Sequence, residues 1–206
     1  MNGITQGLSN NTSLKELDLS DCFGVTPPCW ASLSNAIRNN PGLRLERLHI
    51  SASVLRGEVM TSITSILIDN KSLKELTLRG QLHRSNEVLL ELSNALVNNR
   101  TLKKLILSRI SEYDDQSSGI KALSRVLCNR TSVDATFTSN HTLESIYFLG
   151  SHLPSIVLPS HLTDMLQLNR NDNKFEVSRQ KILRCHLMSV ILKSLWIWIC
   201  KCCLMF

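Results

Sequence analysis

The feature that most constrains the fold of this chain is a segment of about thirty residues that recurs along it. The stretches NNTSLKELDLSD (10–21), DNKSLKELTLRG (69–80) and NNRTLKKLILSR (98–109) are nearly the same. One position of the repeat is marked by Asn11, Asn40, Asn70 and Asn99, with Arg130 in the fifth place, at intervals of 29, 30, 29 and 31 residues. Repetition with this period predicts a solenoid whose neighbouring units share one core.

The residues before each marker predict a helix. Apolar side chains recur seven, four and three residues ahead of it, which places them on one helical face. The four sets are Leu33, Ala36, Ile37; Ile63, Ile66, Leu67; Leu92, Ala95, Leu96; and Leu123, Val126, Leu127. Asparagine suits the end of such a helix because it tolerates the left-handed backbone conformation that stops a helix.

The residues after each marker predict a short strand. They follow the pattern L-x-x-L-x-L, in which the last three residues alternate as a strand does. The members are Leu14, Leu17, Leu19; Leu45, Leu48, Ile50; Leu73, Leu76, Leu78; and Leu102, Leu105, Leu107. Each unit therefore consists of one helix and one strand, and the fold class is α/β.

The segments LKELDLSDC, LERLHIS, LKELTLRG and LKKLILSR, each followed by a helix, resemble leucine-rich repeats of the ribonuclease-inhibitor type. The resemblance implies a leucine-rich repeat solenoid, a horseshoe arc with an inner parallel β-sheet and outer helices. That family favours Asn or Cys three residues after the last strand leucine. Cys22 fits, but Ser53, Gln81 and Ile110 do not, so a polar ladder at this place is expected to be weak.

The chain divides into three parts. Residues 1–151 form the solenoid of about five units, which begins within a helix and is expected to be a fragment of a longer array or a truncated product. In its last unit, residues 132–140 and 143–151 are expected to be two strands joined by a tight loop at Asn140, with no helix between them. Residues 152–186, with helices at about 160–168 and from about 172, form a helical C-terminal cap, and residues 187–206 are a hydrophobic, Cys-rich tail.

The strand residues that point away from the core are the candidate site. They form columns across the strands, and by the resemblance such a concave face binds a protein partner. The candidate partner-binding residues are Glu16, Asp18, Arg47, His49, Glu75, Thr77, Arg79, Lys104, Ile106 and Tyr147. The alternative is a solvated face whose charges only keep the protein in solution.

Composition excludes several other functions. Of the net charge of +6, residues 170–206 carry +5, so the repeats are almost neutral and a nucleic-acid-binding stripe is not expected. Phosphate-loop, zinc-protease, hydrolase and C-x-x-C motifs are missing, which predicts a non-enzymatic protein without cofactor or metal.

The seven cysteines have no disulfide or metal spacing, which favours reduced thiols in a cytoplasmic protein. We expect the protein to be a monomer.

Two alternatives stay open beside a binding module. The first is a regulator of a small GTPase that resembles the activators of Ran-type GTPases and uses Arg79, Arg109 or Tyr113 with Asp114 and Asp115. The second is a membrane-tethered interaction protein, since the apolar tail carries three lipidation candidates, Cys200, Cys202 and Cys203. Lys193 within the tail argues against a membrane span, so an anchor is not favoured over its two alternatives, a helix packed on the last repeat or translated noncoding sequence. The identity of the partner and its pathway are not determined by the sequence.

Overall fold

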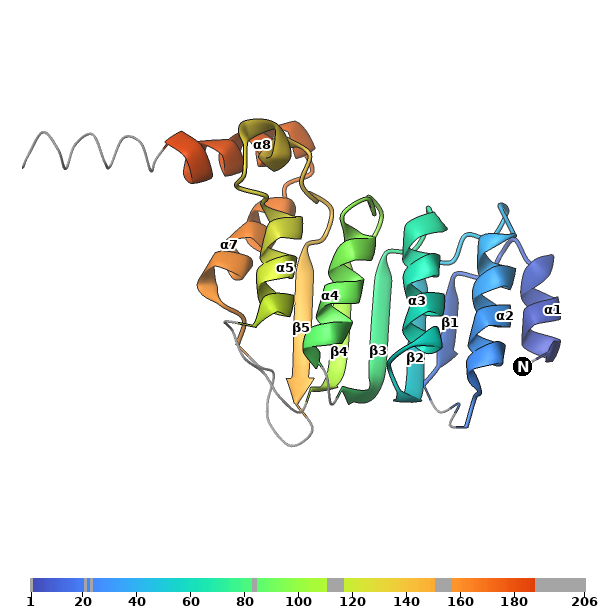
Figure 1. Ribbon diagram of the computed structural model, residues 1–206. Coiled ribbons are helices and arrows are strands. Elements are labelled where there is room, and N and C mark those ends of the chain that lie inside the picture. Colours follow the sequence, from blue (N-terminus) through green and yellow to red (C-terminus); the bar gives the residue numbers. More distant parts are fainter. Residues whose placement is uncertain are drawn as a thin grey trace, which may run out of the picture.

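A computed structural model of the chain describes residues 2–20, 22, 24–82, 85–110, 117–150 and 157–187. In these residues, helices and strands alternate from α1 as far as α5 (Figure 1). The strands are β1 (Glu16–Leu19), β2 (Arg47–Val54), β3 (Glu75–Leu82), β4 (Lys104–Ile110) and β5 (Ser145–Gly150). The helices are α1 (Asn2–Ser9), α2 (Pro27–Arg38), α3 (Glu58–Asp69), α4 (Ser85–Leu96), α5 (Ser118–Leu127), α6 (Val133–Phe137), α7 (Ser160–Asn169) and α8 (Lys174–Ile182), and a π-helical turn spans Leu183–Leu187.

The five strands form one parallel sheet in the order β1-β2-β3-β4-β5. Leu17 aligns with Leu48, Leu48 with Leu76 and Leu76 with Leu105, and Ile146 continues this row into β5. The predicted alignment of the strand leucines is confirmed. A parallel sheet in sequential order with a helix between strands is the leucine-rich-repeat-like arrangement that the repeat predicts.

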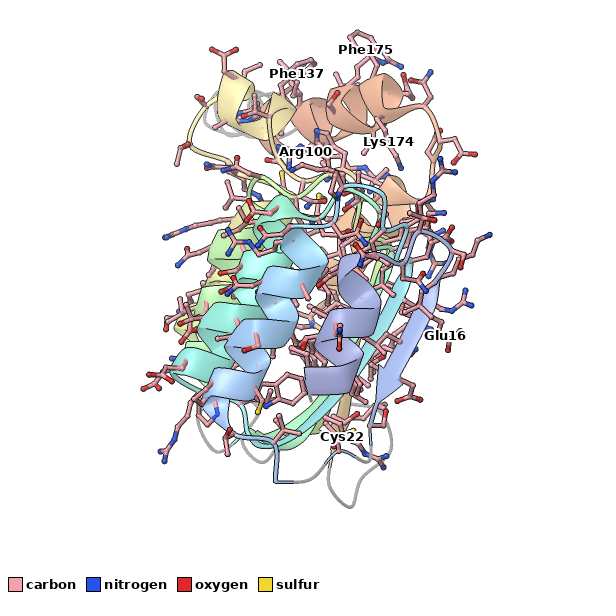
Figure 2. The ribbon with its side chains drawn as sticks, turned by 90° about the vertical axis from the view of Figure 1, so that its right-hand side faces the viewer. Glu16, Cys22, Arg100, Phe137, Lys174 and Phe175 are labelled. Atoms are coloured by element: carbon pink, nitrogen blue, oxygen red, sulfur yellow. The ribbon has the colours of Figure 1, made fainter. Side chains whose placement is uncertain are left out.

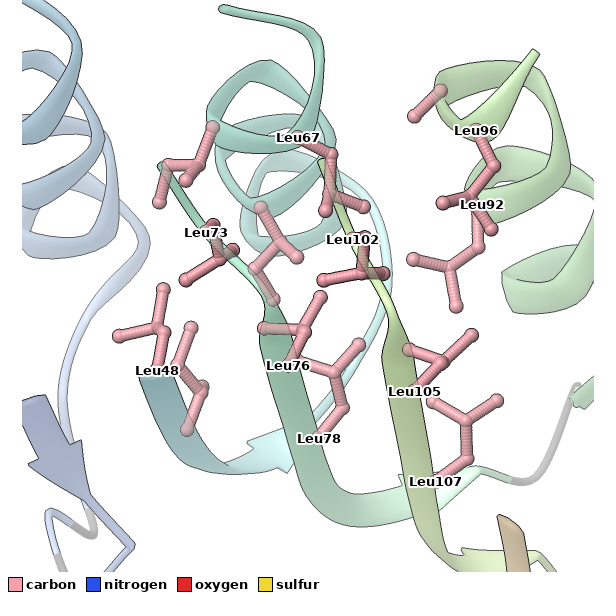
Figure 3. Close-up of a cluster of buried hydrophobic side chains, with 14 of the residues drawn as sticks. Leu48, Leu67, Leu73, Leu76, Leu78, Leu92, Leu96, Leu102, Leu105 and Leu107 are labelled. Atoms are coloured by element: carbon pink, nitrogen blue, oxygen red, sulfur yellow. The ribbon is translucent and has the colours of Figure 1, made fainter. Parts of the chain in front are cut away.

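The core lies between the sheet and a single layer of helices. Figure 2 shows α1 to α5 on one side of the sheet and the other side left open. Figure 3 shows how the core is filled, with leucines from the strands meeting leucines of the neighbouring helices. Leu48, Leu92, Leu102 and Leu105 are fully buried, as is Leu45, the first leucine of the strand pattern in the second unit. Each unit thus shares its apolar contacts with its neighbours, and this explains why the repeat pattern recurs.

The marker asparagines are pinned by their side chains. The Oδ1 atoms of Asn11, Asn70 and Asn99 each accept hydrogen bonds from the backbone N–H groups of the second and third residues that follow them. Asn40 Oδ1 accepts the first of these bonds, from Gly42. The Nδ2 atoms of Asn40 and Asn99 donate to carbonyls of the preceding unit. Asn70 has an extended backbone with φ −74° and ψ 133°, so a left-handed conformation is not why asparagine stands there. The side-chain amide ties consecutive units together.

The last repeat corrects the sequence prediction. Residues 133–137 form α6, and β5 is the single strand of this unit, whereas two strands joined by a tight loop were expected. Asn140 is the fifth marker in place of Arg130: its Nδ2 donates to Leu96 O and Asn99 O, and its Oδ1 accepts from the next backbone amides. An insertion that contains α6 therefore lies between α5 and its marker. The interval of 31 residues to Arg130 concealed this insertion.

The helices after β5 lie where the sequence predicts them. α7 ends in Asn169, which is 29 residues after Asn140 and donates to Asn140 O and Leu143 O. Leu162, Met165 and Leu166 occupy the same apolar positions ahead of this marker as in earlier units and are buried. α7 is thus the helix of a sixth unit, and α8 follows where a strand would begin. Within the described ranges, none of the helices has the length and apolar character required to cross a membrane.

Candidate protein-binding face

The candidate site is the sheet surface that faces away from the helices, which we call the strand face. Figure 2 shows Glu16 on this surface, opposite the helical layer. The backbone register places Glu16, Arg47, Glu75 and Lys104 in one row, followed by Ser145 of β5. A second row holds Asp18, His49, Thr77, Ile106 and Tyr147, and a third holds Ser51, Arg79, Ser108 and Leu149. The structure therefore brings together all ten residues that the sequence placed on this face.

The first row is a set of alternating charges. Arg47 Nε donates to Glu16 Oε2 over 2.8 Å, and Lys104 Nζ lies 3.0 Å from Glu75 Oε1. The hydrogen bond to Glu16 raises the pKa of the Arg47 guanidinium above its usual range. Exposed pairs of this kind contribute little stability, so their charges are available to a partner at small cost to the fold.

The second row changes from polar to apolar along the sheet. Hydrogen bonds from Ser20 lower the pKa of Asp18, and His49 Nε2 lies 3.6 Å from Glu16 Oε1. Ile106 is half-buried, whereas Tyr147 is 43% exposed with Lys104 Nζ 5.8 Å from its ring centroid. An exposed tyrosine beside a lysine provides a large contact area with one polar end.

The third row contributes one large charged side chain. Arg79 is exposed, whereas Ser51 is buried and Ser108 is half-buried. Arg79 therefore projects from the sheet between short side chains of β2 and β4. Its planar guanidinium can bind a carboxylate with two parallel hydrogen bonds.

Sequence reasoning missed a further row of charges, which lies one residue before the strands. Lys74 Nζ lies 3.0 Å from Glu46 Oε2, and Lys103 Nζ lies 2.8 Å from Glu144 Oε1. The lysine partners lower the pKa of Glu46, and Glu144 raises the pKa of Lys103. A hollow of 290 Å³ at this edge is lined by Glu46, Arg47, Lys74, Glu75, Lys103, Lys104, Glu144 and Ser145. The sequence signal for this row is the pair of polar residues inside each L-x-x-L pattern. Only the second residue of each pair was assigned to the candidate site.

A larger hollow lies on the helical side, between α5 and α7. Its volume is 610 Å³, and Ile120, Leu162 and Met165 are among its apolar lining residues. Its charged lining residues are Lys121, Arg125 and Arg130, and Ser124 Oγ lies 2.9 Å from His161 Nε2. The lining includes no carboxylate. This hollow lies among the helices, apart from the strand face.

Some predicted residues fall outside what the structure describes. These are Tyr113, Asp114 and Asp115, the side chain of Arg109, and the cysteines Cys200, Cys202 and Cys203. In the described part of the chain, no three His, Cys, Asp or Glu side chains form a group that could hold a metal ion.

Comparison with known proteins identifies the fold but no family. Neither a protein-family model nor a curated protein matches the sequence. Among solved structures, the chain is similar to leiomodin-1 actin-binding site 2, with a TM-score of 0.54 and 16% sequence identity, over 92% of this chain and 95% of that chain. At this identity the likeness establishes a shared leucine-rich-repeat-like fold.

Proposed function

We propose that this protein is a non-enzymatic interaction module that binds a protein partner on its strand face. The observation that carries the proposal is the open side of the sheet, where rows of charged and aromatic side chains stand in register on parallel strands while every repeat helix lies on the other side (Figure 2). A rigid, preordered surface loses little conformational entropy when a partner binds.

The charge pattern of the face defines the kind of partner. Arg47, Arg79 and Lys104 stand on three neighbouring strands, and Glu16 and Asp18 lie at the β1 edge. A complementary partner would place carboxylates over β2 to β4 and basic groups over β1. Matching charges of this kind set orientation and association rate more than they set affinity.

Actin is the specific candidate partner. The support is the likeness, over nearly the whole chain, to actin-binding site 2 of leiomodin-1. The test is co-sedimentation of the full chain with filamentous actin, together with its effect on polymerisation of monomeric actin. Saturable pelleting or altered polymerisation supports actin as the partner. If both effects are absent at protein concentrations well above those at which the leiomodin domain acts, actin is excluded. If actin does not bind, pull-down with mass spectrometry identifies the partner for experiments on the strand face.

The decisive experiment on the face is a triple charge reversal. Arg47→Glu, Arg79→Glu and Lys104→Glu together should weaken binding of the partner at least about tenfold, because several attractive contacts become repulsive. The matched control reverses three exposed cations outside the strands, Lys71 in the turn after α3 and Lys121 and Arg125 on α5. Circular dichroism shows whether each variant is folded, and equal affinity of the two folded variants would contradict docking on the strand face.

Finer features of the architecture belong to the same proposal. We infer a ribonuclease-inhibitor-like arc with α7 and α8 as its C-terminal cap, because α7 contacts both α5 and β5 and α8 contacts α6 and α7. An apolar core at the end of a repeat array needs such a cover. Small-angle scattering of the full chain would distinguish an arc from a compact globule.

The two alternatives have separate tests. Acceleration of GTP hydrolysis by a Ran-type GTPase would support the regulator, and an unchanged rate would end that hypothesis. Cell fractionation of the full chain and of residues 1–186 would test the membrane-tethered alternative.

A further inference from the structure

Two thiols from distant parts of the chain meet where α5 ends. Cys128 directly follows α5, and Cys185 belongs to the π-helical turn that follows α8. Their Sγ atoms lie 3.1 Å apart although 57 residues separate them in sequence. Cys128 is buried, and Cys185 is half-buried against the core. In Figure 1 the helices that follow α7 lie above the end of α5.

One of the two thiols is held in its protonated form. Burial, followed by the contact with Cys185, raises the pKa of Cys128 to about 11. Cys128 therefore remains a thiol at neutral pH, and in its contact with Cys185 either sulfur can be the donor. Cys185 is the less buried of the two, so its sulfur is the one that a small disulfide reaches first, and a cysteine attacks as its thiolate.

A buried lysine holds this corner together. Lys181 is fully buried, and its Nζ donates to Leu127 O over 2.6 Å and to Asn140 O over 3.1 Å. Cys185 lies one helical turn after Lys181, and Cys128 directly follows Leu127. The hydrogen bond from Lys181 to Leu127 O therefore holds the Cys185 sulfur next to Cys128.

We propose that Cys128 and Cys185 are a reversible disulfide site that is oxidised by a low-molecular-weight disulfide such as glutathione disulfide. The Cys185 thiolate attacks one sulfur of the reagent, whose S–S bond breaks and releases a first thiolate that takes a proton from water. Cys128 then loses its proton to water and attacks the Cys185 sulfur of the mixed disulfide, which releases the second thiolate, and this thiolate also takes a proton from water. Two protein thiols and one disulfide thus become one protein disulfide and two small thiols, and two electrons pass from the protein to the reagent.

The consequence is a covalent link between the last helices and the repeat array. Lys181 and the apolar contacts of α8 hold this end in the reduced protein, whereas the disulfide would close a loop of 57 residues and restrict the unfolded chain. The proposal does not depend on the identity of the partner that binds the strand face.

The test treats the full chain with glutathione disulfide, quenches it with an alkylating reagent and maps the peptides by mass spectrometry. We expect a cross-linked peptide joining Cys128 to Cys185, and a rise of about 10 °C in the thermal midpoint that dithiothreitol reverses. Cys185→Ser should abolish both effects. Cys29→Ser, at a half-buried cysteine on α2, is the matched control and should retain both.

Two results on the unmodified sequence would overturn the proposal without relying on any variant. The first is a folded protein that carries glutathione on Cys185 without forming the cross-link. The second is a cross-link that forms as readily in urea as in buffer, because the folded geometry should favour closure by about 100-fold. A third result, in Cys128→Ser, is also informative: the folded variant should accumulate a stable mixed disulfide at Cys185, and its failure to react there would refute the assigned order of attack.

Discussion

At the scale of single residues, the marker asparagines determine more than their size suggests. Asn99 is 2% exposed, and its Oδ1 and Nδ2 bind backbone groups on both sides of the turn. Asn99→Ala should lower the free energy of unfolding by about 2 to 4 kcal/mol, because several buried backbone groups lose their partners. Asn98→Ala, at the exposed neighbouring residue, should change it by less than about 0.5 kcal/mol. Urea unfolding of both variants measures the difference, and equal losses would contradict the role of the side chain.

Lys181 predicts an unusual pH dependence of stability. Burial lowers the pKa of Lys181 to about 7 in the folded protein, against 10.5 for an ordinary lysine. Between these values the unfolded chain binds a proton that the folded chain does not, so the free energy of unfolding should rise with pH. We expect a rise on the order of 1 kcal/mol per pH unit between pH 7 and 8.5.

The upper limit of this window is set by Cys128. Near pH 9 this cysteine loses its proton in the unfolded chain, whereas the folded chain keeps it because the pKa of Cys128 is raised to about 11. This difference opposes the rise in the free energy of unfolding. Urea unfolding at several pH values measures the slope, which Lys181→Met should remove and Lys15→Met, at an exposed lysine, should retain. An unchanged slope in Lys181→Met would contradict the assignment.

The sequence revealed where the asparagines are but not what they do. The interval of about thirty residues identified Asn11, Asn40, Asn70 and Asn99, whereas their hydrogen bonds join units 29 to 32 residues apart and follow only from the stacked structure. The strand-face residues were predictable because alternation along a strand fixes which side chains leave the core. The contacts of Lys181 with Leu127 and of Cys185 with Cys128 were not, since no repeat relates α5 to α8 and the turn after it.

At the scale of elements, the close approach of α4 and α5 depends on a glycine. A Cβ atom added to Gly119 would lie 2.7 Å from Leu89 Cβ and 2.9 Å from Asn86 O. Gly119→Ala should therefore destabilise the protein by about 1 to 3 kcal/mol despite the better helix propensity of alanine. Gly7→Ala in α1, where a Cβ would meet nothing within 4 Å, should be neutral or stabilise by up to about 1 kcal/mol. Thermal unfolding of both variants distinguishes them, and a stable Gly119→Ala would show that the helices can separate.

The helices and strands of the first four units were predictable because apolar spacing and turn residues agree in each of them. The fifth unit was not, since Arg130 falls at almost the expected interval and the segment 132–140 alternates much as a strand does. The structure shows instead a helix capped by Ser132, whose side chain accepts from Ala135 N. Local capping outweighed a weak alternation that lacked core leucines.

At the scale of the whole molecule, stability should vary along the array. β3 is paired on both sides and covered by helices on one face, whereas β1 is paired in the described sheet only with β2. Native-state hydrogen exchange should therefore show slower exchange in β3 and β4 than in β1. Uniform protection across all strands would indicate a single cooperative unit in place of an array with nearest-neighbour coupling.

The insertion between Leu127 and Asn140 has a practical consequence. The chain there contains α6 and its turns, while only two residues separate Leu96 from Asn99, yet both asparagines anchor the strand that follows. The side-chain amide of the marker asparagine fixes where the next strand begins, whatever the length of the chain before it. Foreign peptides could therefore be inserted just before Asn70 or Asn99, and the repeats that follow should assemble unchanged. This turn is thus a suitable insertion site for grafted binding loops.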